Sequence, residues 1–238
     1  MRYAEQYEDN YAGDMFAADA ALDARAAFIR RTYLHVFGAI AAFVGLEAIV
    51  FNIEAIKMPL VNAIGQNWWM ALIAFMIVSW LAGRWAVSGT SQGVQYLGLA
   101  LYVLAEAVIF VPLLFIASQV GDDIIPMAAG LTLFIFGGLT VAVMVTKQDF
   151  SFLRGALWLG SIAALGLIFA SMLVGFQLGI VFVVAMIVLM SGFILYETSN
   201  ILHHYHTDQH VAAALALFAA IATLFWYVIQ LLMHLSDE

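Results

Sequence analysis

The chain of 238 residues contains no cysteine and few charged side chains. Without cysteine it has no disulfide framework, no thiolate nucleophile and no cysteine-ligated metal site. Charged residues make up 10% of the sequence, against about 25% in an average soluble domain. Hydrophobic residues make up 65%, so too few polar side chains remain to cover a surface that faces water. These scarcities exclude an ordinary soluble globular protein.

Basic residues are scarce as well, since eight Lys and Arg stand against sixteen Asp and Glu, giving a formal net charge of −8. A nucleic-acid-binding protein needs a basic surface, so this class is excluded. The only lysines, Lys57 and Lys147, lie outside the apolar runs, which leaves no lysine for a retinal Schiff base. The zinc-protease motif HExxH and glycine-rich phosphate-binding loops are absent. We therefore predict no enzyme activity, no cofactor and no metal site.

Long apolar runs, separated by short polar segments, fill the sequence from residue 32 onward. A helix of about 20 apolar residues crosses a hydrocarbon core of roughly 30 Å. The runs are too long for barrel strands and lack the alternation of such strands. The sequence predicts an all-α integral membrane protein, a bundle of seven transmembrane helices at about residues 32–56, 68–87, 94–117, 124–145, 155–175, 178–198 and 211–235. Residues 175–177 are expected to form a tight turn between the fifth and sixth spans.

Residues 1–31 precede this transmembrane domain of residues 32–238 and are rich in Asp and Glu. We expect them to form a polar cytoplasmic tail that is loosely ordered or weakly helical. The tail ends in a basic cluster of Arg25, Arg30 and Arg31. Basic residues otherwise fall almost entirely in the loops on the same side of the membrane as the tail, and such an excess marks the cytoplasmic side. The N-terminus is therefore predicted to be cytoplasmic, and the C-terminus periplasmic after seven crossings.

Three carboxylates, Glu47, Glu106 and Glu197, fall within the predicted spans. A charge at the bilayer centre costs at least about 2.5–3.5 kcal/mol, so each is a candidate functional residue. Glu106 lies near mid-membrane and is a candidate site for a proton or a cation; alternatively it is a structural carboxyl that hydrogen-bonds a neighbouring helix. Glu47 lies in the outer half, and it and Asn200 are candidates for polar support.

Glu197 lies near the cytoplasmic end of the sixth span, at the same depth as Arg84 after the second span. A guanidinium and a carboxylate can pair in bidentate geometry, which lowers the cost of both charges. One hypothesis is that Arg84 and Glu197 form a gate or latch. In the alternative, Arg84 extends to lipid phosphates and Glu197 reaches water.

The string HHYHTDQH between the last two spans places four histidines close together: His203, His204, His206 and His210. Their spacing and Asp208 are compatible with a metal site, but no second cluster completes a ligand shell. The sequence favours a solvated loop that responds to pH.

Two longer motifs are more specific: TKQDFSFLRG at residues 146–155 and ILYETSNILH at residues 194–203. Together with FIRRTY at residues 28–33 and the seven spans, they resemble the Bax inhibitor-1 family, and the ETSNI form looks most like its bacterial YccA-type branch. The resemblance covers the chain from about residue 26.

The resemblance implies a compact bundle in which a central, hairpin-like last helix is surrounded by six others. It also implies two functions. The first comes from the wider family, whose members look like pH-sensitive calcium leak pathways. The acidic residue that these proteins carry in the sixth span corresponds to Glu197 here, and its arginine partner falls at or next to Arg84. The resemblance thus implies calcium or protons as ligands. The second acidic residue of the family would fall at position 220, where this chain has Ala220. The missing carboxyl weakens the interpretation as a calcium leak pathway.

The YccA-type branch implies instead a protein of the bacterial inner membrane that binds the FtsH membrane protease and modulates proteolysis under membrane stress. The acidic tail is then a candidate contact for the protease, or else a solvated terminus without a specific role. A third interpretation is a structural membrane protein whose polar residues are inactive.

Overall fold

The computed structural model describes residues 16–87 and 91–236, and this part of the chain is helical with no named strand. The helices are α2 (Leu22–Asn52), α3 (Glu54–Gln66), α4 (Trp68–Ala86), α5 (Gln92–Val120), α6 (Ile124–Thr146), α7 (Arg154–Val174), α8 (Ile180–His203) and α9 (His210–Ser236). A short 3₁₀ helix, η1 (Ser151–Leu153), leads into α7.

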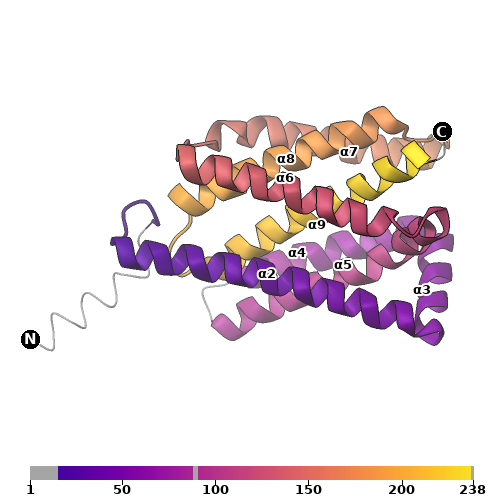
Figure 1. Cartoon of the computed structure of the whole chain (residues 1–238), viewed down its shortest axis with the longest axis horizontal. Helices are drawn as coiled ribbons and strands as arrows, with labels where there is room; N and C mark the ends of the chain where they lie inside the picture. The colour runs from indigo at the N-terminus through magenta and orange to yellow at the C-terminus, as the bar shows by residue number, and fades with distance from the viewer. Residues whose placement is uncertain (1–15, 88–90, 237–238) are drawn as a thin grey trace, which may run out of the picture.

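Seven of these segments are long and apolar enough to cross a membrane, as the sequence predicts. They lie roughly side by side along the bundle, with the start of α2 and the end of α9 at opposite ends (Figure 1). The fifth and sixth spans are separate, because α7 ends at Gly175, which takes a left-handed conformation with φ of +81°. Glycine adopts this conformation without steric cost.

Helix α2 begins at Leu22, ten residues before the expected start of the first span. Its first turns, LDARAAFIRR, consist mostly of alanine, leucine and arginine, which are strong helix formers. With 31 residues at 1.5 Å per residue, α2 is about 46 Å long and exceeds the hydrocarbon thickness. The basic cluster expected in the tail therefore belongs to the helix.

The segment between the first two spans, to which the sequence assigned no helix, is helical. The helix breaks at Ile53, whose backbone is extended, and α3 follows at once. Its 13 residues give a length of about 20 Å, too short to cross the membrane. α3 lies across the end of the bundle (Figure 1).

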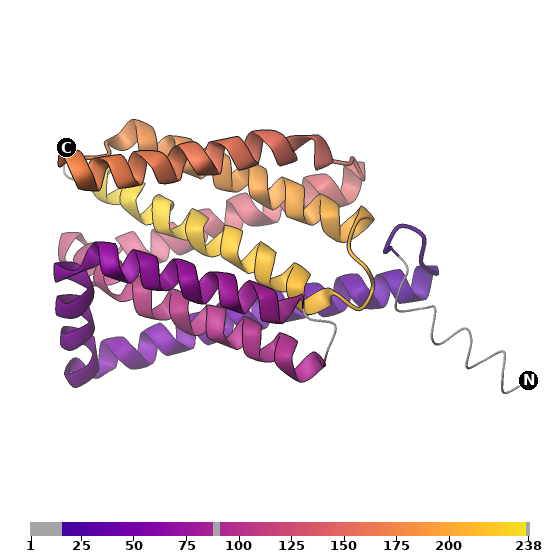
Figure 2. The ribbon, with the colours of Figure 1, turned by 180° about the vertical axis from the view of Figure 1, so that it is seen from behind.

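The last helix, α9, lies at the centre of the bundle and contacts α2, α4, α5, α6 and α8, whereas α7 packs chiefly on α8 (Figure 2). The central position agrees with the expectation from the resemblance. The hairpin shape does not, because α9 is one continuous helix. α5 is nearly as buried as α9, so the core has two central helices.

α4 and α5 lie close together at Gly98 of α5. A Cβ atom at this position would lie 2.6 Å from the carbonyl oxygen of Ala82 and 2.9 Å from the nitrogen of Ala86. Small residues at such crossings let membrane helices gain van der Waals contact.

Candidate functional site

The two sequence motifs meet at the end of the bundle where α6 and α8 end and α7 and α9 begin. Lys147 ends α6 in a left-handed conformation with φ of +52°, and the chain then turns toward α8. The backbone N–H of Phe150 donates to the hydroxyl of Ser199, at 2.9 Å. Ser199 is fully buried, and its hydroxyl lies 3.4 Å from the carbonyl oxygen of Gln148. The α6–α7 linker is thereby fixed to the last turn of α8.

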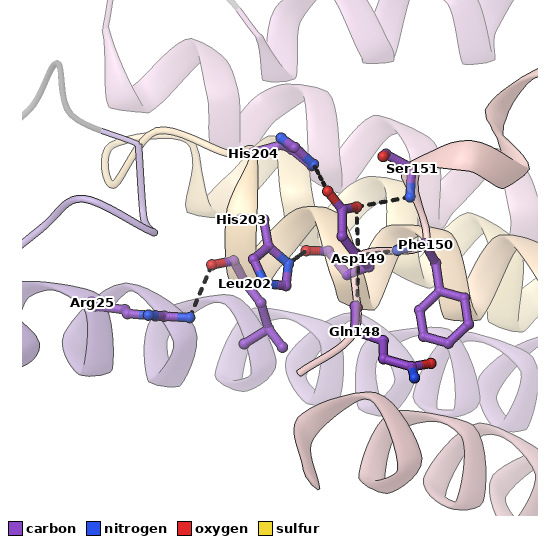
Figure 3. Close-up of polar contacts among 9 residues, drawn as sticks. Arg25, Gln148, Asp149, Phe150, Ser151, Leu202, His203 and His204 are labelled. Atoms are coloured by element: carbon purple, nitrogen blue, oxygen red, sulfur yellow. Dashed lines mark hydrogen bonds and ion pairs between the residues drawn. The ribbon is translucent and has the colours of Figure 1, made fainter. Parts of the chain in front are cut away.

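Asp149 makes the second connection of this linker (Figure 3). One carboxylate oxygen accepts the backbone N–H of Ser151 at 2.8 Å, and the other accepts the Nε2–H of His204 at 3.1 Å. Chiefly the N–H of Ser151, and to a smaller extent the contact with His204, lower the pKa of Asp149 below its usual value. The carboxylate therefore holds the start of α7 and the α8–α9 loop, residues 204–209, in one arrangement.

Glu197 lies beneath the same loop, half-buried on α8. Its Oε2 accepts the hydroxyl of Tyr205 at 3.1 Å and the side-chain amide of Asn200 at 3.4 Å. Burial, and next the negative charge of Glu197, raise the pKa of Tyr205 well above its ordinary value. The structure thus brings two of the candidate residues, Glu197 and Asn200, together, with Tyr205 as a third member that the sequence interpretation did not name.

The predicted ion pair between Arg84 and Glu197 is not formed. Arg84 is exposed, and its guanidinium lies 5.1 Å from the ring centroid of Trp80 on the same helix. Among the residues that the structure describes, the ion pairs are Lys57 with Glu54 and His204 with Asp149. Equal depth did not imply contact, because α4 packs chiefly on α5, whereas Glu197 is carried by α8, which packs on α6, α7 and α9.

Glu106 and Glu47 lie inside the bundle, away from this end. Glu106 on α5 is 3% exposed, and Tyr102, one turn earlier, is its hydrogen-bonding partner. Glu47 on α2 is 7% exposed, and neither of its carboxylate oxygens has a hydrogen-bond partner among the described residues. Ala220, where the family's second acid would fall, is buried on α9.

The four histidines of the α8–α9 region do not converge. Each histidine contacts a different group. His203 lies against the carbonyl of Ser199 and His204 against the carboxylate of Asp149, whereas His206 contacts the ring of Phe16 and His210 contacts the hydroxyl of Tyr96. Within the described ranges, no three His, Cys, Asp or Glu residues are grouped as metal ligands would be.

A segment before α2 covers the α8–α9 loop. The N–H of Ala17 donates to the carbonyl of Tyr205 at 2.8 Å, and Ala17 is fully buried. Phe16 forms an antiparallel β-bridge with His206, and their ring centroids are 4.4 Å apart. This contact was missed in the sequence, where the region was assigned to a loose tail.

Arg25 adds a third contact, because its Nη2 donates to the carbonyl of Leu202 at 3.1 Å (Figure 3). The sequence signal for this docking is weak, a run of four apolar residues, MFAA at residues 15–18, between Asp14 and Asp19. The other part of the expected tail, residues 1–15, lies outside the described residues.

One pentapeptide, GTSQG at residues 89–93, matches the GxSxG pattern of serine hydrolases. In those enzymes the serine follows a strand on a sharp turn. Here the preceding element is helix α4, and the hydroxyl of Ser91 accepts the N–H of Val94 at 3.4 Å as the N-cap of α5. Ser91 therefore has a capping role.

The seven spans and the two joined motifs are those of a multi-pass protein of the Bax inhibitor-1 class. The family described as "Inhibitor of apoptosis-promoting Bax1" matches residues 25–237, and the chain belongs to this family. The prediction of the family is confirmed, and the docked segment of residues 16–20 lies outside the matched region.

Bacterial relatives support the YccA-type branch. The chain is 26% identical over 206 residues to an uncharacterized protein of Pseudomonas aeruginosa, covering 85% of this chain and 87% of the relative. It is 32% identical over 117 residues to the modulator of FtsH protease YccA of Escherichia coli K12, covering 49% of this chain and 53% of YccA. The match to YccA thus spans about half of each protein. An Escherichia coli relative of the same identity is named an inner membrane protein, which agrees with the predicted localisation.

Proposed function

We propose that this protein modulates an FtsH-type membrane protease by protein–protein contact in the bacterial inner membrane, without catalysis of its own. The observation that carries the proposal is the 32% identity to the FtsH modulator YccA. Family membership over nearly the whole chain adds to it.

The two sequence motifs meet where α6 and α8 end, and this end of the bundle is called the motif end. The polar network at the motif end supports a binding role. Its groups bond mostly to one another: Asp149 to His204, Phe150 to Ser199, and Glu197 to Tyr205. Such contacts fix the shape of loops, and a fixed loop surface lowers the conformational entropy cost of binding a partner.

The proposal includes an orientation in which this network faces the cytoplasm and α9 ends in the periplasm. The distribution of Lys and Arg supports it. Alkaline phosphatase, which is active only in the periplasm, fused after residue 238 is expected to be active. Activity of a fusion in the loop that joins α4 and α5, with none at the C-terminus, would contradict this orientation.

Crosslinking in native membranes, followed by purification in detergent, tests the interaction. The wild-type protein is expected to recover the FtsH-type protease. Asp149→Asn, which weakens the link between the α6–α7 linker and the α8–α9 loop, is expected to recover less. The matched control is Glu54→Gln, which changes an exposed acid on α3 at the other end of the bundle. Recovery of no protease with any of the three proteins, even after crosslinking, would refute the proposal.

A second candidate function, a passive proton or cation leak, is favoured by one observation. Glu106 and Glu47 are buried carboxyls within membrane spans, and such residues commonly mark ion pathways. Liposomes that contain the protein are then expected to take up calcium at a rate that changes between about pH 6 and pH 8, and Glu106→Gln to abolish this uptake. A flux equal to that of empty liposomes would exclude the leak.

A further inference from the structure

A polar cavity of about 380 Å³ opens at the motif end, between the start of α7 and the end of α8. The residues that line it include Ser151, Arg154, Tyr196, Asn200, His204 and Gln209. Nothing in the network described above uses Arg154, the cation of this set.

Arg154 is the first residue of α7 and is exposed. Among the residues that the structure describes, it takes part in no ion pair. The two nearby acids are already occupied: Asp149 accepts from Ser151 and His204, and Glu197 accepts from two further donors. The cavity therefore presents a guanidinium that forms no ion pair with a carboxylate of the described residues.

Asn200 and His204 already donate to Glu197 and Asp149, so the remaining donors of the cavity come from three other side chains. The Oε1 of Gln209 accepts the backbone N–H of His206 at 3.2 Å, and this leaves the amino group of its side chain to donate. The hydroxyls of Tyr196 and Ser151 can also donate. Donors around one guanidinium suit a ligand with several anionic oxygens, and phosphate is the common group of this kind.

The surface beside the cavity indicates where such a phosphate comes from. Arg154 lies near the start of a candidate membrane span, Ser151–Val174. A long basic side chain at the end of a span extends to the level of the lipid headgroups. One turn further along α7, Trp158 is 67% exposed and Leu159 beside it is 69% exposed. The helix that carries Arg154 thus exposes apolar side chains one turn beyond the cavity, and this order of a cation followed by an apolar surface suits a headgroup joined to acyl chains.

We propose that this cavity binds the phosphate group of a glycerophospholipid, with Arg154 as the charge partner and the acyl chains along α7. The cavity shares His204 and Asn200 with the polar network described above. Its test measures lipid binding alone and does not depend on the interaction with the protease.

Native mass spectrometry of the full-length, delipidated protein in detergent tests the site by titration with dioctanoyl phosphatidylglycerol. The wild type is expected to bind the first molecule of this lipid more tightly than any further molecules. Arg154→Gln is expected to lower the affinity about tenfold or more, because it removes a charge-assisted hydrogen bond. Arg84→Gln is the matched control, since Arg84 is also exposed near the end of a span but lies against Trp80 and lines no part of this cavity.

Tyr196→Phe serves as a second variant that removes one hydroxyl and keeps the ring, and it is expected to lower the affinity a few-fold. A titration with inorganic phosphate separates the two possible sources of the group. Binding of the lipid but not of inorganic phosphate supports a headgroup site. Binding of inorganic phosphate alone, lost in Arg154→Gln, supports a site for free phosphate and overturns the lipid assignment. Equal lipid affinity of wild type, Arg154→Gln and Tyr196→Phe overturns the proposal altogether.

Discussion

Ser199→Ala tests the joint between the two motifs most simply. The side chain is fully buried, and its hydroxyl is the acceptor for the N–H of Phe150 at 2.9 Å. Alanine fits the space but leaves this N–H without its partner. Phe150, which carries this N–H, is only half-buried, so water can partly replace the lost contact. We expect the free energy of unfolding to fall by about 0.5–1.5 kcal/mol, the net value of a typical hydrogen bond.

Ser191→Ala is the matched control on the same helix. The hydroxyl of Ser191 donates to the carbonyl of Ile187 within α8, at 2.8 Å, so its loss breaks no contact between elements. The free energy of unfolding of this variant is expected to change by less than about 0.5 kcal/mol. Denaturant titration in micelles gives both values, and hydrogen exchange reports the amide of Phe150 directly. Equal stability of the two variants, with unchanged exchange at Phe150, would show that the Ser199 hydroxyl does not hold the α6–α7 linker.

Three further predictions concern packing, pH and the docked segment. Gly98→Ala is expected to destabilise the bundle because its methyl group would meet the carbonyl oxygen of Ala82. Gly166→Ala, which has open space around its added methyl group, is expected to be neutral or stabilising. Melting temperatures that fall equally in the two variants would contradict this expectation. The lowered pKa of Asp149 implies a stabilising contribution that is present above its ordinary pKa of about 3.9 and is lost as the pH falls through the lower folded-state value. Asp149→Asn is therefore expected to melt below the wild type at pH 7, with a difference that narrows below about pH 4, and a constant difference would argue against the contribution. Phe16→Ala is expected to speed hydrogen exchange in the α8–α9 loop and to leave the middle of α9 unchanged; unaltered exchange in the loop would show that the docked segment does not hold it.

The seven spans could be predicted from the sequence because each depends on a local property, a run of apolar residues longer than the membrane is thick. The same criterion could not find α3, which is too short to span. It also placed the start of the first span at the change from polar to apolar residues, whereas α2 begins at Leu22 because helix propensity continues into the polar stretch.

The candidate site shows the same division between local and tertiary information. Asn200 lies three residues after Glu197 on one helix, so their contact follows from helical spacing. The contact between Asp149 and His204 joins residues 55 positions apart and depends on how α6, α7 and α8 pack. Depth along the membrane placed Arg84 level with Glu197 but carried no information about which helices are neighbours. The pair that was one of two hypotheses is therefore not among the ion pairs of the described residues.

Degradation of a membrane substrate by the FtsH-type protease, reconstituted in proteoliposomes with and without this protein, tests the central claim most directly. The substrate is expected to be degraded more slowly when the protein is present in amounts stoichiometric with the protease, and Asp149→Asn is expected to restore part of the rate. An equal rate of degradation with and without the wild-type protein, at every ratio tested, would contradict the claim.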